Sequence, residues 1–85
     1  MMTPEEVAEY NEEALIADGL DEAIIGVAER INLGPVAAYS VEKICEILMT
    51  RDGMTYEEAI EFFEFNIKGS WMGEYTPVYI YTNEG

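Results

Sequence analysis

The sequence predicts a single α+β domain with elements in the order α-β-β-α-α-β and helices packed on one face of a three-stranded sheet. Three observations lead to this prediction. Residues 23–39 have the pattern of a β-hairpin, residues 55–68 begin with a helix-capping pair, and residues 77–82 have the pattern of a last strand. The 85 residues, 1–85, are enough for one modest core and too few for a second domain.

The first predicted element is an acidic N-terminal helix over residues 1–19. Thr3 suits its N-cap, Pro4 suits its first turn, and Gly19 suits its end. Residues 1–22 contain eight acidic side chains and no basic one. Such a run is typical of a solvated helix face. It would also allow this surface to imitate the phosphates of a nucleic acid towards a basic partner.

Residues 23–31 fit either a helix or a strand. The β-branched run, the interior Gly26 and the turn-forming residues 32–35 that follow favour a strand. Residues 36–39 are then expected to return beside it and complete the β-hairpin over 23–39.

Two helices are expected after the hairpin, over residues 40–52 and 55–68. The second begins with a capping box formed by Thr55 and Glu58. We expect it to be the central helix of the fold, because residues 54–81 contain most of the large side chains that a core needs: Tyr56, Ile60, Phe62, Phe63, Phe65, Ile67, Trp71, Val78 and Ile80.

Phe62 and Phe65 lie outside the apolar stripe of this central helix. Either another element covers them, as we expect for a central helix, or they form an exposed aromatic patch that binds a partner. Asn66 is expected on the apolar side of the helix, where it would fix the loop at 69–73 together with Trp71. A role in recognition is the alternative.

Tyr79 and Tyr81 point to the same side of the predicted strand 77–82. They could lie on the sheet face that the helices leave open, where tyrosine suits an interface because it combines a broad apolar ring with a polar tip. Alternatively, the first helix covers that face and Tyr10 meets one of them. The sequence does not decide between these arrangements.

The charge balance is extreme, with 18 acidic and 4 basic residues, no histidine and a net charge of −14. Such a chain repels nucleic acid and anionic membranes and attracts basic partners. No apolar run approaches the roughly 20 residues that span a bilayer, and the N-terminus does not resemble a signal peptide. One cysteine excludes an internal disulfide. We therefore expect a cytoplasmic protein that binds neither membranes nor nucleic acid directly.

The residue types also argue against catalysis. Without histidine and with one cysteine, a zinc site lacks its usual ligands, and no calcium-loop spacing is present. No neighbouring base is available to activate Ser40, Ser70 or Cys45 as a nucleophile. The glycine spacing matches no phosphate-binding loop. We expect a non-enzymatic protein with no catalytic, cofactor-binding or metal-binding residue.

Five short blocks stand out along the chain: AIIGVAER at 23–30, EILM at 46–49, GMTYEEA at 53–59, FFEFN at 62–66, and GE with TP within 73–77. Together they resemble a family of small acidic proteins encoded in bacteriophage genomes. The resemblance extends over roughly residues 15–81 and implies a phage accessory protein in the cytoplasm of a bacterial host. The family has no assigned activity, so the resemblance implies no catalytic residue. The sequence departs from the family pattern at Ala28, where glycine is usual, and at residues 40–43.

Two functional hypotheses follow. In the first, the protein binds a basic surface of a host protein, as an inhibitor or a nucleic-acid mimic, through acidic and aromatic side chains. The candidate residues are Glu5, Glu9, Glu57, Glu61, Glu64, Phe62, Phe65, Trp71, Tyr79 and Tyr81. The alternative is a small-ligand-binding protein that uses the Trp71 loop and the tyrosines, although anionic ligands would find only four basic side chains. A homo-oligomer is compatible with both hypotheses.

Overall fold

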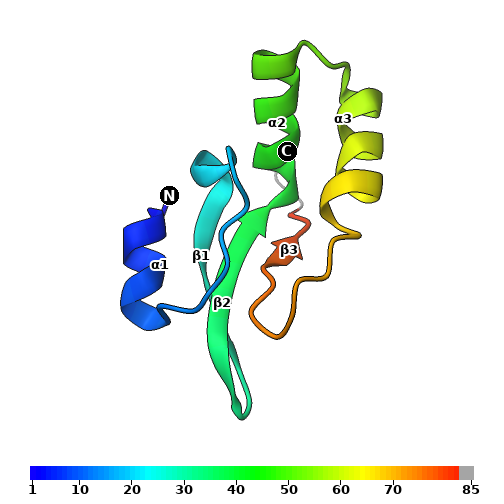
Figure 1. The fold of residues 1–85 in the computed structure, drawn as a ribbon. Coiled ribbons are helices and arrows are strands. Elements are labelled where there is room, and N and C mark those ends of the chain that lie inside the picture. The colour runs from blue at the N-terminus through cyan, green and yellow to red at the C-terminus, as the bar shows by residue number, and fades with distance from the viewer. Residues whose placement is uncertain (83–85) are drawn as a thin grey trace.

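The computed structural model describes residues 1–82 and confirms the α+β class and the predicted order of elements. Residues 83–85 of the predicted domain lie outside the described part. In chain order the elements are α1 (Pro4–Tyr10), the 3₁₀ turn η1 (Asp21–Ala23), β1 (Ile24–Arg30), β2 (Leu33–Ser40), α2 (Val41–Asp52), α3 (Tyr56–Phe62), the π-helical turn η2 (Phe63–Ile67) and β3 (Val78–Ile80) (Figure 1).

The sheet has the order β1-β2-β3, with β2 in the centre. β1 and β2 form the predicted hairpin, so residues 24–30 are a strand and not a helix. The connection between them is tighter than predicted, because β2 begins at Leu33 and not at Val36. Asn32 makes the tight turn possible by adopting a left-handed conformation with φ 64°, which asparagine tolerates better than most residues.

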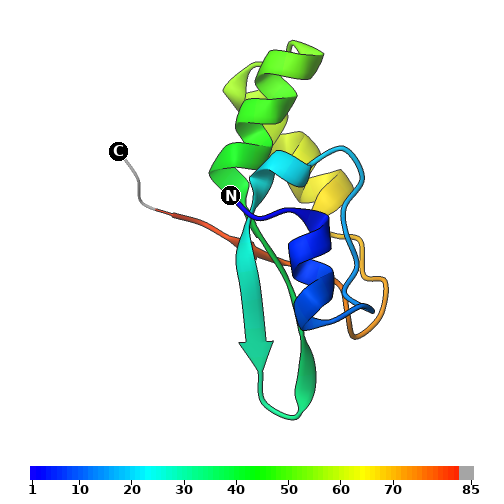
Figure 2. The same cartoon turned by 90° about the vertical axis from the view of Figure 1, so that its left-hand side faces the viewer.

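β3 pairs with β2 in parallel, with Tyr79 opposite Tyr39. A parallel pair cannot be joined by a tight turn, and here α2 and α3 form the long connection that it requires. β3 covers only Val78–Ile80 of the predicted strand 77–82. Figure 2 shows α1 and the chain that follows it on one side of the β1–β2 hairpin, and no helix of residues 1–82 lies on the other side.

The core is built from the sheet, α2 and individual residues of α1, the segment 11–23 and the α3–η2 helix, which corrects the prediction that residues 54–81 supply most of it. Of the large side chains expected there, only Phe63 is fully buried. The largest fully buried side chains are Tyr39, Phe63, Ile24, Ile44, Leu48, Val7, Val36 and Cys45. β2 and α2 contribute most of them. β2 is the central strand of the sheet, and α2 follows it directly in the chain.

α1 ends at Tyr10, so the prediction of a helix over residues 1–19 is wrong beyond its first two turns. Residues 11–20, here called the strap, continue as an irregular segment that passes beside β2 (Figure 1). The Asn11 side chain begins this change by donating to the carbonyl oxygen of Pro35 at 2.8 Å.

Further along the strap, the backbone N–H of Leu15 donates to the carbonyl oxygen of Tyr75 at 3.1 Å. The N–H of Ala17 donates to the hydroxyl of Tyr39 at 2.7 Å. In an α-helix both N–H groups would bond to carbonyls four residues earlier. Tertiary hydrogen bonds have therefore replaced the helix that the local sequence favours.

α3 begins with the predicted capping box, in which the N–H of Thr55 donates to Glu58 at 2.9 Å and the N–H of Glu58 donates to Thr55 at 3.1 Å. The predicted helix over 55–68 is present, but its second half is the π-helical turn η2, closed by a bond from the N–H of Lys68 to the oxygen of Phe63 at 2.8 Å. Such wide turns are rare and often occur at functional sites.

Candidate functional site

The structure divides the candidate residues into separate groups. Glu5 and Glu9 lie on α1, whereas Glu57, Glu61 and Glu64 lie on α3 and η2 at the opposite end of the molecule (Figure 1). The predicted acidic residues therefore do not form one patch. Only the α3–η2 group lies beside the candidate phenylalanines.

Tyr79 and Tyr81 correct both arrangements that the sequence left open. Their rings pack on the helix side against Phe63, with centroid distances of 5.2 Å and 6.3 Å. Tyr79 also contacts Tyr39 at 5.9 Å. Tyr10 takes no part and is exposed. Tyr79 is thus mainly a core residue, while Tyr81 remains 60% exposed at the margin of the core.

Phe62 and Phe65 are exposed by 38% and 81%, so the expectation that another element covers them is wrong. Trp71 and Met72 are also exposed, by 75% and 67%. We call these four side chains the apolar rim.

The roles predicted for Asn66 and Trp71 as anchors of the loop are not observed. The Asn66 side chain is exposed and makes no hydrogen bond within residues 1–82. Thr76 holds the loop instead. Its hydroxyl accepts from the N–H of Met72 at 2.8 Å and donates to the oxygen of Gly73 at 2.7 Å.

An apolar cleft of about 340 Å³ lies between the strap, the end of α2, the α3–η2 helix and β3. Its lining is Leu15, Ile16, Ala17, Asp18, Leu20, Leu48, Arg51, Phe62, Asn66, Ile67, Ser70, Met72, Thr76, Pro77 and Tyr79. The sequence reasoning missed most of these residues. The local signal is the apolar run at 14–17 inside an otherwise acidic segment, and it falls within the helix predicted over residues 1–19.

A second, more polar depression of about 520 Å³ adjoins the cleft along α3. It contains three carboxylates and two aromatic rings, and its lining is Asp52, Gly53, Met54, Glu58, Glu61, Phe62, Phe65 and Asn66. Phe62 and Asn66 line both hollows.

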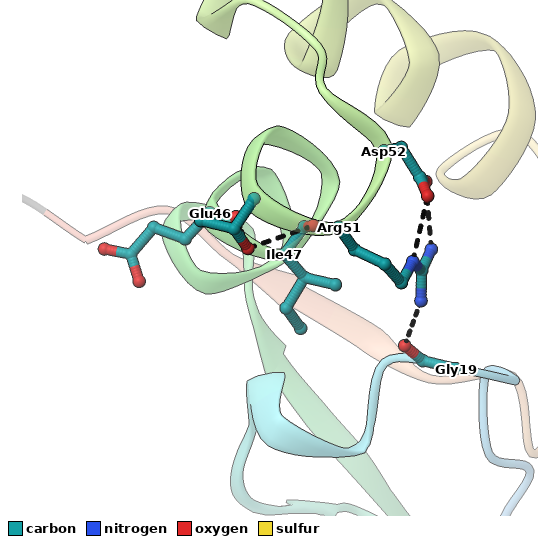
Figure 3. Close-up of polar contacts among 6 residues, drawn as sticks. Gly19, Glu46, Ile47, Arg51 and Asp52 are labelled. Carbon is teal, nitrogen blue, oxygen red and sulfur yellow. Dashed lines mark hydrogen bonds and ion pairs between the residues drawn. The ribbon is translucent and has the colours of Figure 1, made fainter.

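Arg51 joins the strap to the end of α2 (Figure 3). Its Nη1 donates to the carbonyl oxygen of Gly19 at 2.9 Å, and its Nε and Nη2 both donate to the Asp52 carboxylate at 3.1 Å. These hydrogen bonds lower the pKa of Asp52 and raise that of Arg51. The cation at the edge of the cleft is therefore already neutralised.

The other carboxylates are largely uncompensated. All acidic residues except Glu84 lie within residues 1–82, and only Asp52 and Glu64 form ion pairs there, with Arg51 and Lys68. Every one of these acids is exposed except Glu42, which is half-buried. The surface thus keeps most of the −14 net charge unscreened by its own side chains.

Within residues 1–82 no three potential metal-ligating side chains cluster together, and none of the helices has the length and hydropathy of a bilayer span. Burial raises the pKa of the Cys45 thiol, which disfavours the nucleophilic thiolate.

No protein-family model, curated protein or solved structure matches this chain. The resemblance to small acidic phage proteins accordingly stays a prediction.

Salt should stabilise this protein. We expect the melting temperature to rise between low and physiological ionic strength, because screening weakens repulsion among the exposed carboxylates. A gain of about 1 kcal/mol would correspond to roughly 4–8 °C for a domain of this size. The Glu9→Gln/Glu12→Gln double variant, which neutralises two exposed acids outside the first turn of α1, should melt higher than the parent at low salt and respond less to added salt. A flat response in the parent would contradict this prediction.

Proposed function

We propose that this protein is a non-enzymatic binding protein whose α3–η2 side docks on a basic surface of a partner protein. The observation that carries the proposal is the apolar rim, formed by the exposed side chains of Phe62, Phe65, Trp71 and Met72. Phe62 and Met72 line the same cleft, Phe65 lies with Phe62 in the adjoining depression, and Trp71 precedes Met72 in the chain. Exposed large apolar side chains commonly mark an interaction site.

Charge specifies the kind of partner. Glu57, Glu61 and Glu64 are exposed beside the rim, and the protein as a whole has a net charge of −14. Complementary charge speeds association and rejects acidic partners, whereas desolvated aromatic anchors slow dissociation. The resemblance to phage proteins suggests that the partner is a host protein in the bacterial cytoplasm, inhibited by occupation of a surface that would otherwise bind nucleic acid.

The rim can be tested by removing two of its aromatic side chains. We expect Phe65→Ser/Trp71→Ser to weaken the affinity for a purified partner by roughly tenfold or more per aromatic residue, as for interface hot spots. The partner would first be isolated on the tagged protein from a bacterial lysate. Affinity and its salt dependence would then be measured by surface plasmon resonance.

The Tyr10→Ser/Ile31→Ser variant is the matched control, because both side chains are large, apolar and exposed outside the rim. Its affinity should equal that of the parent. Equal binding by both variants, or binding that does not weaken with salt, would refute the proposed docking surface.

The apolar cleft supports a second candidate function, the binding of a small ligand. Its volume of about 340 Å³ is at the lower end of the range for small-molecule pockets, roughly 300–1,000 Å³. Tyr79 lines the cleft, but Trp71 does not. An anionic ligand is disfavoured because Asp52 already neutralises Arg51. Saturable binding of a neutral apolar compound that leaves partner affinity unchanged would favour this function.

A further inference from the structure

We infer that the apolar cleft and the acidic depression form one continuous groove, and that this groove takes a cationic amphipathic helix of the partner. The inference deepens the proposed function and rests on it. The continuity comes from Phe62 and Asn66, which line both hollows and lie four residues apart on the same face of α3–η2.

The cleft half suits apolar side chains. Leu20 of the strap, Leu48 of α2 and Ile67 of η2 contribute to its lining from three different elements. The cation at its edge already has hydrogen-bond partners, because the Arg51 guanidinium donates to the Gly19 carbonyl oxygen and to the Asp52 carboxylate. An apolar side chain would lose little free energy by entering here, whereas an anionic side chain would meet the Asp18 carboxylate and an arginine that Asp52 already neutralises.

The depression half suits the cationic head of an arginine or lysine. Asp52 and Glu58 already accept hydrogen bonds, from Arg51 and from the N–H of Thr55. Glu61 has no hydrogen-bond partner within residues 1–82 and remains available. The rings of Phe62 and Phe65 also line this half, and aromatic faces attract cations.

A helix can place both kinds of side chain at once. Apolar residues spaced at i, i+4 and i+7 would enter the cleft, and basic residues on the neighbouring strip would reach the depression. The −14 net charge rejects an acidic helix at this position. The groove therefore specifies a partner segment with a narrow apolar stripe and a basic flank.

The test uses fluorescence anisotropy with a labelled synthetic peptide of about four helical turns, carrying leucines at this spacing and arginines on the flank. A peptide of the same composition with its leucines distributed around the helix is the charge-matched control. Two pairs of variants test the two halves of the groove.

In the cleft half, Met72→Lys places a cation in the lining, whereas Met49→Lys makes the same change on α2 outside both hollows. In the depression half, Glu61→Gln removes the free carboxylate, whereas Glu9→Gln removes one on α1. We expect a loss of affinity of about tenfold for Met72→Lys and about threefold for Glu61→Gln, with both controls within about twofold of the parent.

Equal losses in all four variants, or equal affinity for the control peptide, would mean that only net charge matters and would overturn the inference. So would amide chemical-shift changes confined to residues that line neither hollow when the peptide binds. If the peptide fails to bind while the partner still depends on Phe65 and Trp71, the groove inference falls and the proposed function stands. If the peptide binds as expected but the partner binds Phe65→Ser/Trp71→Ser as tightly as the parent, the groove is supported and the proposed docking surface is wrong.

Discussion

Replacing Phe63 by alanine should destabilise the protein by about 3–5 kcal/mol, the usual cost of truncating a fully buried phenylalanine. Phe63 is 0% exposed and lies where η2 meets β3. Its ring meets those of Tyr79 and Tyr81 edge-on, with interplanar angles of 79° and 82°. Truncation would remove these contacts and leave a cavity in the layer that joins the helix to the parallel strand.

Phe65→Ala is the matched control, because it makes the same chemical change two residues away at a side chain that is 81% exposed. Its free energy of unfolding should stay within about 0.5 kcal/mol of the parent value. Urea denaturation of the parent and both variants measures the difference. If Phe63→Ala unfolds the chain altogether, Phe63→Leu provides a milder core variant whose loss can still be measured. A loss at position 63 as small as the one expected at position 65 would show that Phe63 is not a core residue.

The contrast between these two phenylalanines shows what the sequence could and could not predict. Both follow the same capping box, and the 100° periodicity correctly placed Phe63 on the buried stripe and Phe65 off it. Whether a further element would cover Phe65 depends on tertiary packing, which periodicity does not encode. The sequence analysis expects another element to cover Phe65, but its side chain is exposed to solvent.

Capping residues predict the starts of α1 and α3 correctly. The caps at Thr3 and Thr55 are both present, because a cap satisfies backbone groups within three residues of itself. The strand pattern at 24–30 also held, since its turn and its partner strand are adjacent in sequence.

The strap was mispredicted for the opposite reason. Its hydrogen-bond partners are Pro35, Tyr39 and Tyr75, all distant in sequence. Hydrogen bonds to these residues replace those of the helix that the local sequence favours. The sequence does not predict the cleft either, because the strap forms one of its walls. The candidate aromatics could be selected from sequence, but the hollow beside them could not, since it exists only after the strap, α2 and β3 have come together.

The buried Tyr39 should make the protein lose stability at alkaline pH. Burial of its phenol is the main cause that raises the pKa to about 12, partly offset by the hydrogen bond from the N–H of Ala17. In the unfolded chain a tyrosine has a pKa of about 10. The folded state therefore favours the neutral phenol. Its stabilising contribution is complete below about pH 10 and is lost as the pH rises towards about 12, by roughly 2–3 kcal/mol.

Comparison with Tyr39→Phe isolates this effect, because all other titrating groups, including Tyr79, are present in both proteins. Near neutral pH the variant should be less stable by about 1–2 kcal/mol, since the N–H of Ala17 loses its acceptor at 2.7 Å. Free energies of unfolding measured in urea from about pH 8 to pH 12 should show this difference shrinking and then changing sign as the parent phenol ionises. Tyr10→Phe removes an exposed phenol and should follow the parent throughout. A difference between parent and Tyr39→Phe that stays constant across this range would show that the Tyr39 phenol ionises as easily in the folded protein as in the unfolded chain.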